Sequence, residues 1–184
     1  MTMPASSLRI STARLLLRPV EEADSEPTAA LVTQDISQNL STWQFPMSAA
    51  QALEKIRHSR RMAETREAVD FAIVERGSGS LAGWIGLKLE QDVARLGYWI
   101  GAEYRGQGLT TEAARAVLPA AGLFLGTSNI RALVLPSNAP SIALLKRLGF
   151  ALSGEESVYI QTRQSSETCL KFEFSFEQQL YRQA

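Results

Sequence analysis

The sequence predicts a single-domain α/β (α+β) fold, in which about four helices flank a mixed, mostly antiparallel sheet of about six or seven strands. Three observations lead to this class. Three strand candidates in the middle of the chain are joined by connections too short for a crossover helix, so they must run antiparallel. Past them, a helix links two further strands, as in a β-α-β unit. A chain of 184 residues is also short for two separate hydrophobic cores.

The first elements of the chain are a short strand and a helix. Three leucines at residues 15–17, bounded by Pro19, indicate the strand, and an acidic opening predicts a helix over residues 21–32. Residues 34–46 are polar and are expected to form a loop. We expect the aromatic residues of this loop, Trp43 and Phe45, to anchor it to the core rather than to contact a ligand.

A longer helix and the three antiparallel strands follow. Ser48 is in the N-cap position of this helix with Gln51 at the capping-box position, and apolar residues recur at helical spacing to about residue 66. The strands are the apolar segments at residues 69–75, 81–89 and 93–100.

The rest of the chain contains two helix candidates and three strand candidates. Pro136 closes one strand, and Gly149 ends the second helix. In chain order, the segments are the Ala-rich helix 109–124, the strand 130–135, the helix 141–148, and the strands 150–161 and 168–176. We expect one domain over residues 1–184, with a core from about residue 8 to residue 178.

Composition argues against several classes of function. Lys plus Arg and Asp plus Glu number 19 each, so no global positive field favours nucleic acid, and the basic run at residues 55–61 is interpreted as a solvated helix face. Cys169 is the only cysteine, which excludes an intramolecular disulfide and cysteine-based metal clusters, and we expect it to be buried in a strand. No segment approaches the roughly 20 apolar residues of a membrane span. We therefore expect no metal, no nucleic-acid partner, no membrane and a cytoplasmic location.

A glycine-containing loop is the strongest local signal for a ligand. Arg105-Gly106-Gln107-Gly108 lies between a strand that ends near residue 100 and a helix that begins near Leu109. Free backbone N–H groups and the positive end of the helix dipole can hold a pyrophosphate there, and glycine allows the backbone to approach it closely. Arg105 adds a positive charge and Thr110 a hydroxyl, although capping of the helix explains the threonine equally well.

The loop alone leaves other interpretations open. The dinucleotide-binding fingerprint has a third glycine where this chain has Thr111, and it opens a parallel series of β-α-β units, whereas this loop follows antiparallel strands. A P-loop kinase needs Gly-Lys followed by Ser or Thr, and no such segment follows. A tight strand-to-helix turn without a ligand is as compatible with the loop as a phosphate site is.

Several motifs in a fixed order make the assignment more specific. They are Thr12-Ala13-Arg14-Leu15-Leu16-Leu17-Arg18-Pro19, Leu96-Gly97-Tyr98-Trp99-Ile100, Tyr104-Arg105-Gly106-Gln107-Gly108-Leu109-Thr110-Thr111-Glu112-Ala113, Asn138-Ala139-Pro140-Ser141 and Leu148-Gly149-Phe150. Together they resemble the GCN5-related N-acetyltransferase (GNAT) superfamily, and within it the branch of the ribosomal-protein N-terminal acetyltransferases (RimJ/RimL-like). The resemblance covers nearly the whole chain and implies a GNAT-type fold with splayed central parallel strands.

The resemblance implies acetyl-CoA as the cosubstrate, bound where the strands at residues 93–100 and 130–135 splay apart. The backbone of Ile100 would pair with the pantetheine amide, and Asn138 would hold the CoA arm. The chain departs from the family at Glu103, where Gln or Arg is frequent, but backbone contacts are insensitive to this change. The loop residues implied to bind the pyrophosphate are Arg105, Gly106, Gln107, Gly108, Leu109 and Thr110.

The resemblance also implies a proton donor for the leaving thiolate. Many relatives use a tyrosine at the position of Leu145, whereas this branch places a serine at Ser141, three residues after Asn138. We expect Ser141 to act as the general acid, while a backbone N–H of the splayed strand stabilises the oxyanion. The alternative is that Asn138 caps a helix and Ser141 is only a first-turn residue.

The general base is not identified by the motifs. The branch often has a carboxylate at the position of Arg95, and His58 lies among arginines where a surface position is expected. Four other carboxylates, each of which also fits an exposed turn, are Glu90, Asp92, Glu155 and Glu156. Because an α-amine has a pKa of about 7.7 to 8.0 and a lysine about 10.4, the missing carboxylate favours an acceptor amine of low pKa.

The predicted function is the transfer of an acetyl group from acetyl-CoA to a primary amine by direct attack in a ternary complex. The amine is a protein N-terminal α-amine or a small-molecule amine, and the sequence does not determine which. The alternative is a non-catalytic acyl-CoA sensor, favoured by Arg95 at the carboxylate position and by Leu145. A monomer and a homodimer are both compatible with the sequence.

Overall fold

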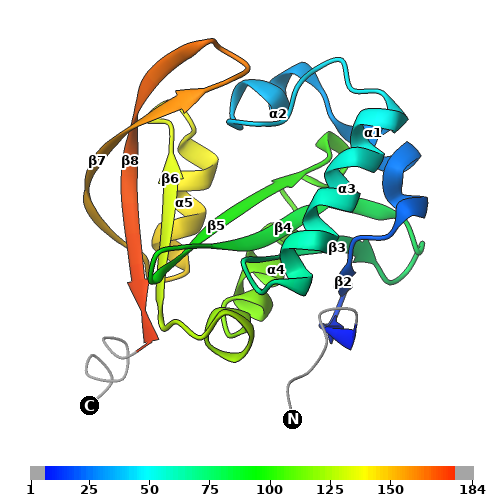
Figure 1. The fold of residues 1–184 in the computed structure, drawn as a ribbon, viewed down its shortest axis with the longest axis horizontal. Coiled ribbons are helices and arrows are strands. Elements are labelled where there is room, and N and C mark those ends of the chain that lie inside the picture. The colour runs from blue at the N-terminus through cyan, green and yellow to red at the C-terminus, as the bar shows by residue number, and fades with distance from the viewer. Residues whose placement is uncertain (1–6, 177–184) are drawn as a thin grey trace.

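The computed structural model describes residues 7–176, in which one sheet of eight strands forms the framework (Figure 1). The strands are β1 Ile10–Ser11, β2 Leu15–Pro19, β3 Ala68–Glu75, β4 Leu81–Glu90, β5 Val93–Ile100, β6 Asn129–Val134, β7 Ala151–Ile160 and β8 Ser165–Ser175. Their order in the sheet is β1-β2-β3-β4-β5-β6-β8-β7, and only β5 and β6 are parallel. The predicted mixed, mostly antiparallel sheet is confirmed, with eight strands instead of six or seven. The predicted end of the core at residue 178 lies outside the described residues.

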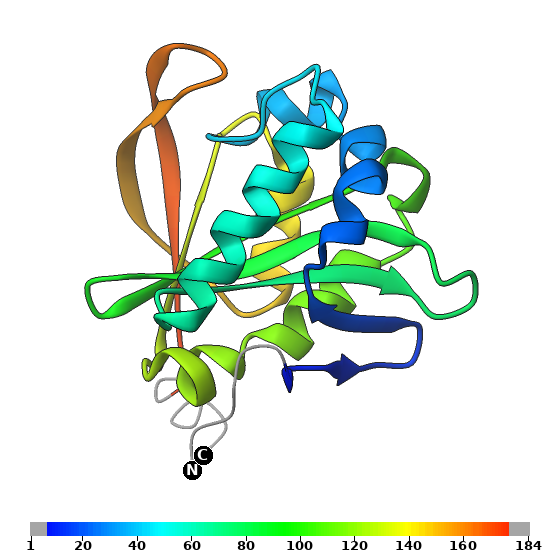
Figure 2. The same ribbon diagram turned by 45° about the vertical axis from the view of Figure 1, so that its right-hand side comes forward.

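Helices cover both faces of the sheet (Figures 1 and 2). Hydrophobic residues of α1, α2 and α3 pack on one face together with Trp84 and Trp99, while those of α4 and α5 pack on the other face. No helix within residues 7–176 is long and apolar enough to cross a membrane. The α-helices described are α1 Ser25–Leu31, α2 Gln34–Gln38, α3 Ala49–Glu64, α4 Leu109–Val117 and α5 Ala139–Arg147, and single turns of other helix types lie at Glu22–Asp24, Ala102–Tyr104 and Ala121–Leu125.

The helix boundaries follow from capping and from proline. In α3, Gln51 N donates to Ser48 Oγ over 3.2 Å and Ser48 N donates to Gln51 Oε1 over 2.8 Å, so the predicted capping box is present. The short helix α2 was not predicted, and it begins where Thr33 Oγ1 accepts from Ile36 N over 3.4 Å. The predicted helix 109–124 ends early, at Val117, because a proline two residues later cannot continue the backbone hydrogen bonds.

The sheet divides at the junction of its two parallel strands. Register between β5 and β6 is limited to the pairs Ala94 with Ile130 and Arg95 with Arg131. Beyond these pairs, β5 continues to pair with β4 as far as Ile100 on one side, and β6 continues to pair with β8. The carboxyl-terminal parts of β5 and β6 therefore diverge, which confirms the predicted splay.

The segment between α2 and α3 is held on the sheet by aromatic contacts. The ring of Trp43 meets the rings of Trp84 and Trp99 edge-on, with centroids 5.0 Å apart in both cases. Trp84 is fixed in turn, because its Nε1 donates to Thr28 Oγ1 of α1 over 2.9 Å. Trp43 thus anchors its segment to the core, as predicted, whereas the prediction is wrong for Phe45, which is 50% exposed.

Candidate active site

The loop before α4 has the geometry of an anion-binding site. Gly106 and Gly108 have φ angles of 74° and 75°, in the left-handed region that glycine adopts readily. Gly108 is the N-cap of α4, so the first N–H groups of the helix point out of its positive end. Among the described residues, the backbone N–H groups of 106–110 donate to no protein acceptor. An added Cβ on Gly106 would meet no atom within 4 Å, so the space beside the loop is open to a ligand.

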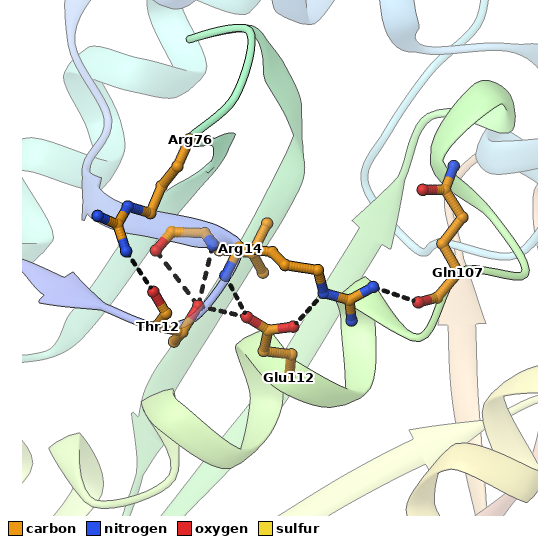
Figure 3. Close-up of polar contacts among 6 residues, drawn as sticks. Thr12, Arg14, Arg76, Gln107 and Glu112 are labelled. Carbon is orange, nitrogen blue, oxygen red and sulfur yellow. Dashed lines mark hydrogen bonds and ion pairs between the residues drawn. The ribbon is translucent and has the colours of Figure 1, made fainter.

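The N-terminal segment, here residues 12–14, holds this loop in place (Figure 3). Arg14 Nη1 donates to Gln107 O over 2.8 Å, and Arg14 Nε forms an ion pair of 2.7 Å with Glu112 Oε2 of α4. Glu112 Oε1 accepts from Thr12 Oγ1 over 2.6 Å and from Arg14 N over 2.9 Å. Arg76 Nη1 donates to Thr12 O over 2.8 Å and so ties the segment to the end of β3.

The pKa of Glu112 reflects these contacts. Burial raises it, but hydrogen bonds from Thr12 and from Arg14, together with the guanidinium charge, outweigh burial and lower it. Glu112 is therefore ionised at neutral pH and fixes the first turn of α4 to Arg14. The motif that contains Thr12 and Arg14 thus has a structural role at the loop that its sequence position did not indicate.

The other loop residues have different surroundings. Arg105 Nη1 forms an ion pair of 2.6 Å with Asp35 of α2, so that part of its guanidinium faces α2. Gln107 Nε2 donates to Glu103 O over 2.9 Å. The backbone N–H of Gln107 is not used in this bond and is left for a ligand. Leu109 is buried in the core, whereas Thr110 is half-buried in the first turn of α4. Ile100 ends β5 beside the loop, at the splay.

Two hydroxyl groups meet at the splay. Asn138 Oδ1 accepts from Ser141 N over 3.2 Å, so Asn138 caps α5, as the alternative interpretation predicted. The side-chain amide nitrogen of Asn138 is left for another partner. The Ser141 side chain is a hydrogen-bonding neighbour of Tyr98 on β5. Burial raises the pKa of Tyr98, and this hydrogen bond offsets part of the rise. Sequence reasoning had not assigned a role to Tyr98, although it lies in one of the family-like motifs.

A cleft of about 610 Å³ opens on the α3 face of the sheet. Its walls include Trp43, Trp84 and Trp99, and Tyr98 lines it at the splay. Tyr98 also packs against the core on the α4 face. The indole Nε1 of Trp99 is buried and has no hydrogen-bond partner among the described residues.

Asp70 is a carboxylate in this cleft that the sequence analysis did not single out. It lies on β3 between the buried residues Val69 and Phe71. Desolvation raises its pKa, while hydrogen bonding from Ser59 and the positive charges of His58 and Lys55 partly oppose the rise. An acidic residue between buried apolar residues of a strand is the signal that could have identified it. His58 is exposed, as expected, and lines the same cleft.

The carboxylates considered from the sequence lie in other surroundings. Glu90 forms ion pairs of 3.2 Å with Arg95 and 2.8 Å with Arg131, which occupy both of its oxygens. Glu156 pairs with Arg131 over 3.3 Å. Asp92 and Glu155 are exposed, and none of these four carboxylates lines the cleft. Cys169 is buried in β8, as predicted, and its pKa is raised by burial and by neighbouring carboxylates.

An opening between splayed parallel strands, with free backbone N–H groups at one end, fits an enzyme that binds an acyl-CoA and transfers its acyl group. The chain belongs to the acetyltransferase (GNAT) domain family, which matches residues 14–151. It is accordingly an acyl-CoA-dependent acetyltransferase, as the sequence resemblance implied.

Relatives and solved structures agree with this family. The chain is 29% identical over 147 residues to the "Putative ribosomal N-acetyltransferase YdaF" of Bacillus subtilis, which covers 77% of this chain and 80% of that protein. The fold matches RimJ of Mycobacterium smegmatis in complex with CoA-disulfide with a TM-score of 0.82, 20% identity, and coverage of 97% and 91% of the two chains. It matches the ribosomal-protein-S5-alanine acetyltransferase of Vibrio fischeri with a TM-score of 0.79, 16% identity, and coverage of 92% and 97%.

Proposed function

We propose that the protein transfers an acetyl group from acetyl-CoA to a primary amine by direct attack in a ternary complex. The observation that carries this proposal is the splay of β5 and β6. The loop and α5 lie on one face of the sheet, and the aromatic cleft lies on the other face. The donor would enter from the α4 face and the amine from the α3 face, so that both meet at Tyr98. The whole chain would then serve as one acetyltransferase domain.

The donor would be held mainly by backbone groups. The N–H groups of 106–110 fit a pyrophosphate, because they are free and lie at the positive end of α4. The unpaired inner edge of β5, ending at Ile100, fits the amides of the pantetheine arm, and the Asn138 amide is available to the same arm. Arg105 would add charge from the guanidinium nitrogens that Asp35 does not occupy.

The chemistry would need one proton donor at the sulfur. The amine nitrogen attacks the thioester carbonyl carbon, the C–N bond forms, and the C–S bond breaks as the thiolate leaves. The Ser141 hydroxyl gives its proton to the thiolate and regains one through Tyr98. An N–H of the unpaired edge of β5 would stabilise the oxyanion in the tetrahedral intermediate.

The acceptor is proposed from the relatives and from the cleft. Several structural neighbours are named for acetylating ribosomal proteins, and a protein N-terminal α-amine is therefore the first class to test. Small-molecule amines are the second class, because another neighbour is an acetyltransferase solved with acetyl-CoA and AMP. We propose a cytoplasmic protein that acts as a monomer or a homodimer and binds no nucleic acid.

A thiol-release assay tests the proposal. Purified protein with acetyl-CoA is given peptides with free N-termini, amino acids, polyamines or aminoglycosides, and free CoA thiol is measured. We expect turnover with at least one class, and Ser141→Ala should lower kcat by about a hundredfold. Binding of CoA, measured by calorimetry, should be unchanged in this variant. Ser153→Ala is the matched control, because Ser153 is exposed on β7.

Two results would contradict this assignment. Unchanged turnover in Ser141→Ala would remove Ser141 from the mechanism. Tight binding of CoA by the wild-type protein without thiol release, for all acceptors and across pH, would instead support a non-catalytic acyl-CoA sensor.

A further inference from the structure

A carboxylate followed by two glycines forms a row across the sheet on the cleft side. Asp70 of β3 is in register with Gly86 of β4, and Gly86 is in register with Gly97 of β5. Neighbouring strands are about 4.8 Å apart, so Gly97 lies about 10 Å from Asp70 along this row. Gly97 is also on the strand that forms one side of the splay.

Gly86 and Gly97 have no side chains, which leaves room above the strands of this row. A Cβ on Gly86 would overlap Asp70 Oδ1, so the carboxylate lies directly over the backbone of β4. A Cβ on Gly97 would meet no atom within 4 Å, so the space above β5 is open. Asp70 and the open space above Gly97 therefore line the same cleft.

The surroundings of Asp70 suit a group that gains and loses a proton. The described residues give it no ion pair within 4.0 Å, although Lys55 lies near enough to influence its pKa. The Lys55 ammonium instead lies 5.0 Å from the centroid of the Trp43 ring. Burial raises the pKa of Asp70, which brings it closer to the neutral range where a general base works best.

We propose that Asp70 is the general base of the transfer reaction and receives the ammonium group of the acceptor from the α3 face. This inference rests on the proposed function. In the family branch the corresponding carboxylate stands at the position of Arg95 on β5, and here β3, which is separated from β5 by β4, would supply it. An acceptor amine seated above Gly97 would have the Asp70 carboxylate on one side and the thioester carbonyl on the other.

The protons balance in this scheme. The acceptor ammonium gives one proton to the Asp70 carboxylate, which later releases it to solvent. The free amine forms the C–N bond, and the nitrogen then loses a second proton, which replaces the proton that the Ser141–Tyr98 pair gives to the thiolate. The departing thiolate gains one proton from Ser141, which is restored through Tyr98. The net products are the acetylated amine, CoA thiol and one proton.

The test compares Asp70→Asn with Ser59→Ala. The carboxamide keeps the shape of Asp70 and its ability to accept a hydrogen bond from Ser59, but it cannot take a proton. We expect Asp70→Asn to lower kcat/KM for the amine by about a hundredfold at neutral pH, with KM for acetyl-CoA and the melting temperature unchanged. The loss should shrink as the pH rises toward the pKa of the acceptor, since the free amine then forms without a base.

The pH profile distinguishes two roles of Asp70: a general base, and a residue that only holds α3 on β3. The wild-type kcat/KM should rise on the acid side as Asp70 ionises, and Asp70→Asn should lack this limb. Ser59→Ala should keep the plateau but move the limb to higher pH, because the hydrogen bond from Ser59 lowers the pKa of Asp70. His58→Gln should keep the limb, which separates it from histidine titration. The charged or titratable side chains that face Asp70 or line the cleft with it are Glu54, Lys55 and His58 of α3, Lys88 of β4, Arg95 and Tyr98 of β5, and Cys169 of β8.

Three outcomes would overturn the proposal. Wild-type turnover with an unchanged rate and pH profile in Asp70→Asn would exclude Asp70 as the base while leaving the proposed function intact. Equal losses of activity and melting temperature in Asp70→Asn and Ser59→Ala would show that Asp70 only holds α3 on the sheet. A wild-type protein that binds CoA and acetylates no amine would overturn the proposed function and this inference together.

Discussion

Ser141 and Tyr98 reach the splay from two different elements. Ser141 is in the first turn of α5, and Tyr98 projects from β5. Because burial raises the pKa of Tyr98, its phenol stays protonated at neutral pH and can donate to Ser141. The pair would let a weakly acidic serine deliver a proton at the sulfur and recover it from a second hydroxyl, which a serine surrounded only by apolar groups could not do.

Removing one hydroxyl of this pair tests the relay. We expect Tyr98→Phe to lower kcat about tenfold, which corresponds to about 1.4 kcal/mol and is within the range of one hydrogen bond. KM for acetyl-CoA should change little, as measured in the thiol-release assay. Tyr159→Phe serves as the control, because Tyr159 is 61% exposed on β7. A rate identical to wild type at every pH would show that Ser141 needs no hydroxyl partner.

At the scale of elements, the loop and the first turn of α4 act as one unit. Gly108 occupies the left-handed region at the N-cap, and Glu112 holds the turn to Arg14. The loop is therefore preformed, and the donor does not have to order it. Preformed N–H groups bind an anion more tightly than groups that must first be arranged.

Substitution at Gly108 should loosen this unit. An alanine there is strained by about 1 kcal/mol at φ 75°, so we expect KM for acetyl-CoA to rise about fivefold while kcat at saturating donor stays near wild type. Gly77→Ala is the matched control, because Gly77 has no positive φ and an added Cβ there meets no atom within 4 Å. Equal KM values for the two variants would argue against a role of the left-handed turn in donor binding.

The sequence predicted the elements best where local chemistry alone sets them. The bounds of β5 at residues 93–100 were predicted correctly, and the Ser48 cap of α3 depends only on residues three apart. By contrast, β1 has only two residues and exists because it pairs with β2, which short-range patterns do not reveal. Similarly, α2 lies in a polar segment, and its Ile36 is buried against residues distant in sequence.

The candidate site was predictable to the extent that it follows family-like motifs. The loop, Asn138 and Ser141 lie in contiguous motifs, and the family resemblance carried by these motifs predicted their roles. Asp70 depends on strand register, because only the alignment of β3, β4 and β5 places it beside Gly86 and Gly97. The contact between Arg14 and Glu112, which spans 98 residues of sequence, is likewise a product of the tertiary fold.

At the scale of the whole molecule, the proposed function gives the two substrates separate entrances. The loop and α5 lie on the face opposite α3, and the aromatic cleft lies on the α3 face, so donor and acceptor can be bound at the same time. Direct transfer then needs no covalent enzyme intermediate. The buried thiol of Cys169, with its raised pKa, is a poor nucleophile for the alternative two-step route.

Steady-state kinetics can distinguish these routes. With both substrates varied, we expect intersecting double-reciprocal lines, and Cys169→Ser should retain turnover within a few fold. Mass spectrometry of protein incubated with acetyl-CoA alone should detect no acetyl group on Cys169. Parallel lines together with an acetylated Cys169 would instead establish a two-step transfer.

The limited pairing of β5 with β6 has a further consequence for the free protein. A sheet normally has two outer edges, but here the diverging parts of β5 and β6 add two inner edges with unpaired backbone groups. Unpaired edges attract foreign strands and promote association between chains. A bound pantetheine arm would form hydrogen bonds with the unpaired backbone groups of β5 at that position. The donor would therefore also reduce self-association. Cellular acetyl-CoA would help to keep the enzyme dispersed as well as active.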